Sequence, residues 1–117
     1  YDLRFPVWCR NVSNEYDLII AVANWPRPRR EVFRTLLRAR AMENLSYVIG
    51  VNRVGEDPNR LVYSGDSVII DPRGKALVEA EEGADTVITA TLDYAPLQDL
   101  RQKFPVWADA DPFLLQI

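Results

Sequence analysis

The sequence contains no histidine, and Cys9 is its single cysteine. Without histidine, neither a Ser-His-Asp triad nor a Cys-His pair can be built from this chain. A zinc site would lack its usual ligands, and one cysteine cannot form an internal disulfide. We therefore expect no metal and no cofactor, and the cysteine usage favours a reducing, cytoplasmic location.

Long apolar runs are also missing, and basic residues are not in excess. The longest apolar run, from Leu18 to Ala23, has the length of a buried strand and is too short to cross a bilayer. The formal net charge is −3, whereas a protein that binds nucleic acid needs a basic face. We therefore expect no membrane segment and no nucleic-acid partner.

The apolar residues that are present, 48% of the chain, can supply the core of one structural unit over residues 1–117. The pattern predicts a short turn or helix near residues 3–11, a strand over 18–23 covered on both faces, and a helix over 31–45. A strand over 47–51 and a mostly polar loop over 52–63 follow. The order of strand, helix and further strands indicates an α/β fold with a mixed sheet.

The last third of the sequence is expected to add more strands and a final helix. Residues 71–74 read Asp-Pro-Arg-Gly, the pattern of a type I turn, and predict a hairpin between strands at 67–70 and 76–78. The β-branched stretch 86–92 predicts a further strand. Leu97, Leu100 and Phe104 mark one face of a terminal helix, for which Asp93 is a plausible cap.

The predicted helix over 31–45 places charged residues on its apolar side. Its buried face consists of Val32, Phe33, Leu36, Leu37 and Ala39, and the same arc holds Arg40 and Glu43. These two residues are three positions apart, so their side chains can meet on the helix surface. The pair is either an internal ion pair that fixes packing, or a pair that faces a site or a subunit interface.

Several short motifs occur in an order that resembles one enzyme family. The chain opens with Tyr-Asp-Leu-Arg-Phe-Pro, and it continues with Ala-Asn-Trp-Pro at 23–26, Ala-Arg-Ala-Met-Glu-Asn at 39–44, Asn-Arg-Val-Gly at 52–55 and Gly-Asp-Ser at 65–67. Together with Asp-Pro-Arg-Gly at 71–74 and Lys-Phe-Pro-Val-Trp at 103–107, they resemble the omega-amidase-like branch of the nitrilase superfamily of carbon–nitrogen hydrolases.

The resemblance implies an αββα sandwich, of which this chain would be the C-terminal part, and a parent enzyme that hydrolyses small ω-amides of 2-oxo acids such as 2-oxoglutaramate. Such enzymes use a cysteine nucleophile, a glutamate and a lysine. The resemblance places the nucleophile directly before Tyr1 and the other two further upstream, so we expect the chain to be inactive without that N-terminal half. The family also implies a homo-oligomer, commonly a homodimer.

The resemblance further suggests candidate site residues. The backbone N–H of Tyr1 is a candidate oxyanion-hole donor. Arg4 either binds a substrate carboxylate or forms a buried ion pair with Asp2 or Glu43. Asn24 and Trp25 follow a strand, where α/β sites collect, and either line the pocket or pack the loop.

Two other functions stay open at this point. The parent protein could be a carbamoylase or nitrilase of the same superfamily, which would differ in substrate. It could also be a non-catalytic scaffold in which the nucleophile is replaced. Cys9 is interpreted as a buried thiol rather than the nucleophile, because it lies outside the motif position and has no histidine to activate it.

Overall fold

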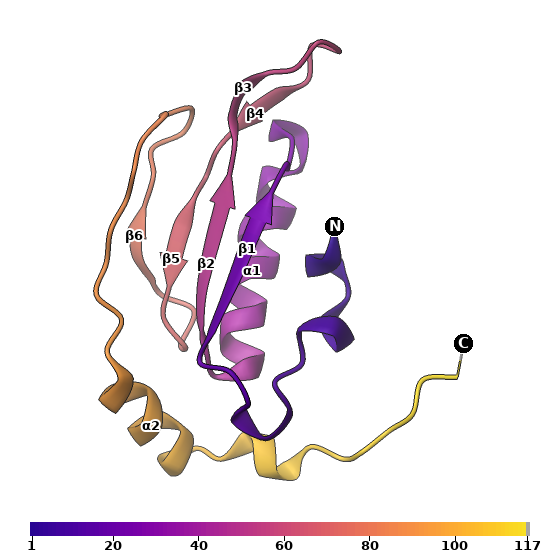
Figure 1. Ribbon diagram of the computed structural model, residues 1–117, viewed down its shortest axis with the longest axis vertical. Helices are drawn as coiled ribbons and strands as arrows, with labels where there is room; N and C mark the ends of the chain where they lie inside the picture. Colours follow the sequence, from indigo (N-terminus) through magenta and orange to yellow (C-terminus); the bar gives the residue numbers. More distant parts are fainter. Residues whose placement is uncertain (117) are drawn as a thin grey trace.

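The computed structural model describes residues 1–116 and forms a mixed α/β unit (Figure 1). Two α-helices and six strands make up its regular structure, and five 3₁₀ turns connect or flank them. The helices and strands are β1 (Leu18–Ala23), α1 (Arg30–Asn44), β2 (Tyr47–Asn52), β3 (Val54–Glu56), β4 (Val62–Ser64), β5 (Val68–Ile70), β6 (Ala76–Glu79) and α2 (Tyr94–Lys103). The 3₁₀ turns are η1 (Asp2–Arg4), η2 (Pro6–Cys9), η3 (Val12–Asn14), η4 (Arg27–Arg29) and η5 (Val106–Asp109).

The main sheet has the strand order β1-β2-β5-β6. β1 and β2 are parallel and are joined by α1, whereas β5 pairs antiparallel with both β2 and β6. The hairpin predicted around residues 71–74 is present, and the backbone N–H of Gly74 donates to the carbonyl of Asp71 over 2.9 Å. The predicted fold class, α/β with a mixed sheet, is therefore confirmed.

Helix α1 covers one face of this sheet and forms most of the core with it. Phe33, Leu37 and Ala41 are fully buried against β2 and β5. The helix approaches β2 so closely at Gly50 that an added Cβ would lie 2.4 Å from Leu37 Cδ1. Val32 was predicted on the buried face but is 37% exposed. The buried face of α1 instead runs through Phe33, Leu37 and Ala41, four residues apart.

The opposite face of the sheet carries apolar side chains that nothing within residues 1–116 covers completely. Ile20 and Val22 of the edge strand β1 are 61% and 83% exposed, and Val51, which pairs with Val22, is 44% exposed. Within residues 1–116, strand β1 is therefore covered on one face only, and coverage of its second face stays a prediction for the intact protein. An apolar run indicates burial, and here it accompanies a sheet face that residues 1–116 leave largely exposed.

Three further predictions need correction. Residues 52–63 were predicted as a loop, but β3 lies within this range, β4 begins at its end, and the two strands pair antiparallel. Residues 86–92 form no strand: β-branched residues favour extended backbone, but no neighbour within residues 1–116 supplies a hydrogen-bonded ladder. Asp93 is the N-cap residue of α2 without a side-chain cap, and its carbonyl instead accepts the Tyr47 hydroxyl over 2.8 Å.

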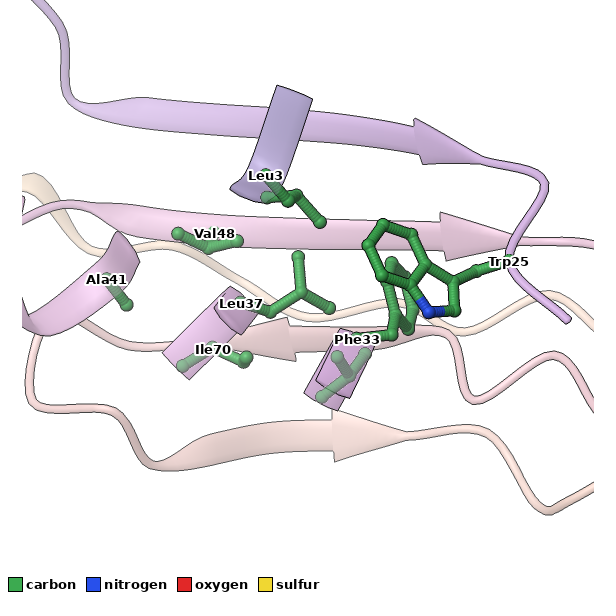
Figure 2. Packing of buried hydrophobic residues seen from close by; sticks show 8 residues of the cluster. Leu3, Trp25, Phe33, Leu37, Ala41, Val48 and Ile70 are labelled. Atoms are coloured by element: carbon green, nitrogen blue, oxygen red, sulfur yellow. The ribbon is translucent and has the colours of Figure 1, made fainter. Parts of the chain in front are cut away.

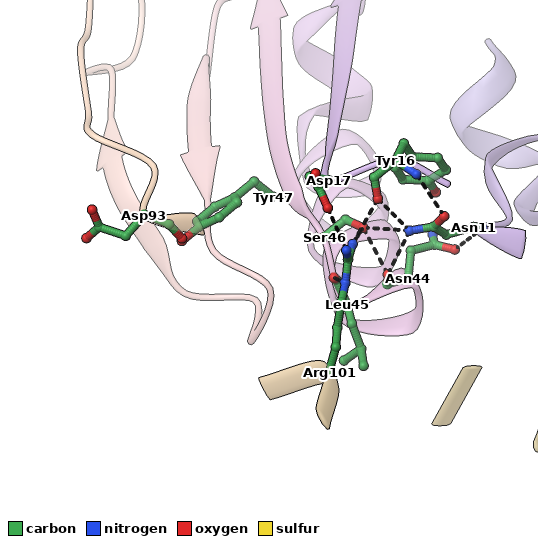
Figure 3. A network of polar contacts seen from close by, with 9 residues as sticks. All are labelled: Asn11, Tyr16, Asp17, Asn44, Leu45, Ser46, Tyr47, Asp93 and Arg101. Carbon is green, nitrogen blue, oxygen red and sulfur yellow. Dashed lines mark hydrogen bonds and ion pairs between the residues drawn. The ribbon is translucent and has the colours of Figure 1, made fainter. Parts of the chain in front are cut away.

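The C-terminal helix is attached to the sheet through a buried arginine (Figure 3). Arg101 of α2 forms a 2.5 Å ion pair with Asp17 and donates to the carbonyls of Leu45 and Tyr16. Leu45 ends α1 in the left-handed region, with φ 44°, so its carbonyl is turned away from the helix and needs another donor. Arg101 thus joins α2, the end of α1 and the start of β1. Leu97 and Leu100 of α2 are buried, whereas Phe104, predicted on the same helix face, lies beyond the helix end and is 58% exposed.

No helix within residues 1–116 is both long enough and apolar enough to cross a membrane.

Candidate functional site

The candidate site residues lie where β1 and β2 end. Trp25 follows β1 and is only 7% exposed, with its ring 5.6 Å from that of Phe33 between centroids. The indole N–H of Trp25 donates to the carbonyl of Arg29 over 2.8 Å, which holds the ring against the turn η4. Trp25 is therefore packed against η4 and Phe33, and its role in lining a pocket stays a prediction.

Turn η1 is held beside Trp25 by a side chain from α1. Leu3 is buried in the same cluster as Trp25 and Leu37, as Figure 2 shows. The carbonyl of Leu3 accepts a hydrogen bond from Nη2 of Arg40. Arg40 Nη1 lies 2.8 Å from Glu43 Oε1, and the Arg40 side chain is 4% exposed.

The sequence-based prediction of an Arg40–Glu43 pair is thus confirmed. Arg40, but not Glu43, also contacts the backbone of η1, through the carbonyl of Leu3. The pair is internal on the arginine side, whereas Glu43 is 41% exposed.

Arg4 extends from η1 over the outer face of the tryptophan ring. Its guanidinium carbon lies 5.2 Å from the ring centroid of Trp25, within cation–π range. Arg4 is exposed and makes no ion pair with Asp2 or Glu43, so the interpretation as a buried ion pair is wrong. Its contact surface is aromatic rather than acidic, which leaves the guanidinium donors of Arg4 without a carboxylate among residues 1–116.

Tyr1 and Asn24 lie at the edge of the same region. Tyr1 is 84% exposed, packs its ring 5.4 Å from that of Phe5, and accepts the backbone N–H of Arg4 at its carbonyl over 3.1 Å. Asn24, which directly precedes Trp25, is exposed. The proposed roles of these two residues, an oxyanion-hole donor and a pocket-lining amide, stay predictions.

The structure adds one residue that the sequence interpretation did not single out. The carboxamide of Asn52, at the end of β2, accepts the backbone N–H of Trp25 over 2.7 Å. It also donates to the carbonyls of Trp25 and Gly65, each over 2.9 Å. The only sequence signal was its place in the motif Asn-Arg-Val-Gly at 52–55.

The buried residue Asp66, which follows Gly65, connects α1 to the turn before β5. Asp66 is 2% exposed and accepts from Arg30 Nη2 and from the Ser64 hydroxyl, each over 2.5 Å. The hydrogen bond with Asp66 raises the pKa of Arg30 above its ordinary value. Asp66 holds φ 59°, a left-handed backbone that is unusual for a residue other than glycine. This contact fixes the turn that contains Gly65.

The cysteine lies away from these residues. Cys9 ends turn η2 and is half-buried, and its carbonyl accepts the hydroxyl of Tyr16. Burial raises the pKa of Tyr16 to about 12, and the electrostatic effects of Cys9 and Glu43 add smaller contributions in the same direction. Tyr16 therefore stays a neutral donor in this contact at any physiological pH.

A separate groove of about 400 Å³ lies between η2, the end of α1 and η5, and neither Arg4, Asn24 nor Trp25 lines it. Among residues 1–116, no three His, Cys, Asp or Glu side chains lie close enough together to hold a metal ion. The candidate site residues thus offer one exposed cation, the guanidinium of Arg4, whose carbon lies 5.2 Å from the ring centroid of Trp25.

Comparison with known proteins gives consistent results. A family model described as carbon-nitrogen hydrolase matches residues 1–102. The omega-amidase YafV of Escherichia coli (strain K12) is 53% identical over 115 residues, which cover 98% of this chain and 44% of that protein. The 2-oxoglutaramate amidase of Bacillus subtilis (strain 168) is 37% identical over 112 residues, which cover 93% of this chain and 42% of that protein.

The solved structures agree with the sequence matches. The crystal structure of XC1258 from Xanthomonas campestris, a CN-hydrolase superfamily protein with an arsenic adduct in the active site, superposes with a TM-score of 0.94. It is 47% identical in sequence, and the match covers 99% of this chain and 46% of that one. The chain thus spans less than half of the length of each of these three relatives.

Proposed function

The chain belongs to the carbon–nitrogen hydrolase family, and from this premise we propose that it is the C-terminal part of a cysteine-dependent amidase that hydrolyses small ω-amides of 2-oxo acids. The substrate class follows two similar proteins, named omega-amidase and 2-oxoglutaramate amidase. The part of each relative that this chain does not match would supply the nucleophile, the glutamate and the lysine. Residues 1–117 alone would then have no activity.

One observation supports this function above the others. Arg4 is exposed, stacked on Trp25 and free of any carboxylate within residues 1–116. A guanidinium binds a carboxylate through two parallel hydrogen bonds, and ring stacking restricts its orientation before the ligand arrives. An ω-amide of a 2-oxo acid carries such a carboxylate at the end opposite its amide.

The proposed reaction has two steps. The cysteine thiolate attacks the amide carbon to form a tetrahedral intermediate. The glutamate would protonate the amide nitrogen, so that the C–N bond breaks, neutral ammonia leaves and a thioester remains. Water then attacks the thioester and releases the acid and the thiol. In both steps the oxyanion needs donors, and the backbone N–H of Tyr1 is the donor that this chain would provide. Asn24 would line the pocket beside Trp25.

The decisive experiment measures ammonia release by the intact protein from three substrates in separate assays. They are 2-oxoglutaramate, an N-carbamoyl amino acid and a nitrile. Preferred turnover of the ω-amide supports the proposal. Preferred cleavage of the carbamoyl compound or the nitrile would identify a carbamoylase or nitrilase of the same superfamily. No turnover of any of the three would favour a non-catalytic scaffold.

The exposed sheet face bears on the partners that we propose. Ile20 and Val22 present apolar surface on an edge strand, which is an aggregation hazard if it stays uncovered. We propose that the N-terminal half of the enzyme covers this face, and that the complete sandwiches assemble as homo-oligomers. Sedimentation of the intact protein tests the assembly, and a monomer at micromolar concentration would contradict it.

A further inference from the structure

We propose that Asn52 is a positioning residue for substrate binding: its carboxamide fixes Trp25, and Trp25 in turn orients the guanidinium of Arg4. This inference rests on the proposed function, in which Arg4 binds the substrate carboxylate. It adds a residue that would not touch the substrate and that acts through two others.

The first step is the contact between Asn52 and Trp25. The carboxamide of Asn52 accepts the backbone N–H of Trp25 over 2.7 Å and donates to its carbonyl over 2.9 Å. Both backbone polar groups of one residue are thus bound by a single side chain. Since Trp25 lies just beyond β1, where the sheet ladder no longer holds it, this side chain replaces the missing strand neighbour.

The second step concerns how rigidly Asn52 itself is held. Its backbone N–H donates to the hydroxyl of Ser67 over 3.0 Å, and the same hydroxyl donates to the Asn52 carbonyl over 3.2 Å. The carboxamide also donates to the Gly65 carbonyl over 2.9 Å, next to the buried Asp66. Asn52 is therefore fixed to the turn before β5, and it passes that rigidity to Trp25.

The third step is the transfer from Trp25 to Arg4. The guanidinium carbon of Arg4 lies 5.2 Å from the ring centroid, and Arg4 has no carboxylate neighbour among residues 1–116 to orient it otherwise. A tilt of the tryptophan ring would therefore move the preferred position of the guanidinium. Productive binding geometry is sensitive to displacements of about 1 Å, so a small change at Trp25 is expected to weaken carboxylate binding.

The test compares two substrates in the intact enzyme. One is 2-oxoglutaramate, and the other is an aliphatic amide of similar length without a carboxylate. Asn52→Ala is expected to raise KM for the charged amide about 2- to 10-fold, the usual range for loss of a positioned hydrogen bond. KM for the uncharged amide is expected to change much less, because that amide has no carboxylate for Arg4 to bind. A merely structural role would reduce both activities together.

A double-mutant cycle separates the inference from the function on which it rests. In an Arg4→Ala background, Asn52→Ala should have no further effect on KM. Additive effects, or equal losses on both substrates, would overturn the inference and leave the role of Arg4 intact. If Arg4→Ala itself left KM for the charged amide unchanged, the proposed role of Arg4 would fail, and the inference with it.

Two more variants complete the design. Asn52→Asp keeps the volume and the acceptor for the Trp25 N–H but cannot donate to either carbonyl, so it serves if Asn52→Ala does not fold. It should show the same selective rise in KM for the charged amide as Asn52→Ala. Asn59→Asp, at an exposed position of the turn between β3 and β4, is the matched control and should leave KM for both substrates unchanged.

Discussion

Replacing Arg40 by alanine should destabilise the protein far more than replacing Arg38, two positions away on the same helix. Arg40 is 4% exposed, bonds the carbonyl of Leu3 and pairs with Glu43 at 2.8 Å. Arg38 is half-buried, and no ion pair to it is found among residues 1–116. The two variants remove the same side chain from the same helix, so the difference between them measures the environment of Arg40.

The magnitude follows from what each contact contributes. A hydrogen bond from a charged donor to a carbonyl is worth about 1.5–3 kcal/mol, and a partly exposed ion pair adds roughly 0.5–1 kcal/mol. Truncation to alanine also removes the packed alkyl stem. We therefore expect Arg40→Ala to lower the free energy of unfolding by about 3 kcal/mol. This is the lower end of the range for breaking a buried pair, since Glu43 is 41% exposed and can be hydrated.

The assay is urea unfolding of the intact protein, with thermal unfolding as a second measure. Arg38→Ala should change the free energy of unfolding by no more than about 0.5 kcal/mol, because no ion pair or side-chain hydrogen bond of Arg38 is found among residues 1–116. Arg40→Met keeps the stem but loses both polar contacts, so it should fall between the other two variants. Equal midpoints for Arg40→Ala and Arg38→Ala would refute the interpretation that Arg40 holds η1 against α1.

Three more predictions concern other parts of the chain. Arg101→Ala should lower the free energy of unfolding by about 3–5 kcal/mol, because it removes the partner of Asp17, the donor to the Leu45 carbonyl and one of the two donors to the Tyr16 carbonyl. Lys103→Ala, at an exposed ion pair, should cost no more than about 1 kcal/mol in the same urea titration. Gly50→Ala should destabilise by about 1–3 kcal/mol because the new methyl would meet Leu37 at 2.4 Å, and calorimetry would contradict this if the variant melted at the wild-type temperature. Burial raises the pKa of Tyr16 from 10.0 to about 12, so its contribution to stability is fully present below pH 10 and lost as the pH rises toward 12. Tyr16→Phe should therefore flatten the fall in melting temperature between pH 9 and pH 12, while Tyr94→Phe, at an exposed position, should leave that fall unchanged.

Some features of this protein were predictable from the sequence because they depend on local physical chemistry. The apolar run 18–23, the periodicity of residues 31–45 and the turn pattern at 71–74 each specify an element through neighbours within a few positions. The Arg40–Glu43 pair is of the same kind, because three residues of helix bring those side chains together in any context. The ordered motifs also indicated the family to which the chain belongs.

Other features depended on the tertiary structure because they join residues that are distant along the chain. The stretch 86–92 has β-branched composition, but a strand needs a partner, and the described chain provides none. Arg4 was expected either to bind a carboxylate or to pair with a nearby acid. Its stacking on Trp25 arises only because Arg40 fixes η1 beside the end of β1.

The roles of Asn52 and Arg101 were likewise hidden in the sequence. Asn52 acts on a residue 27 positions away, and Arg101 on one 84 positions away. Local sequence pattern predicted the helices, the hairpin and the strands β1 and β2, because helix and strand periodicity depend on near neighbours. The sites depend on which backbone groups remain unpaired once those elements pack, and only the folded chain decides which side chains satisfy them.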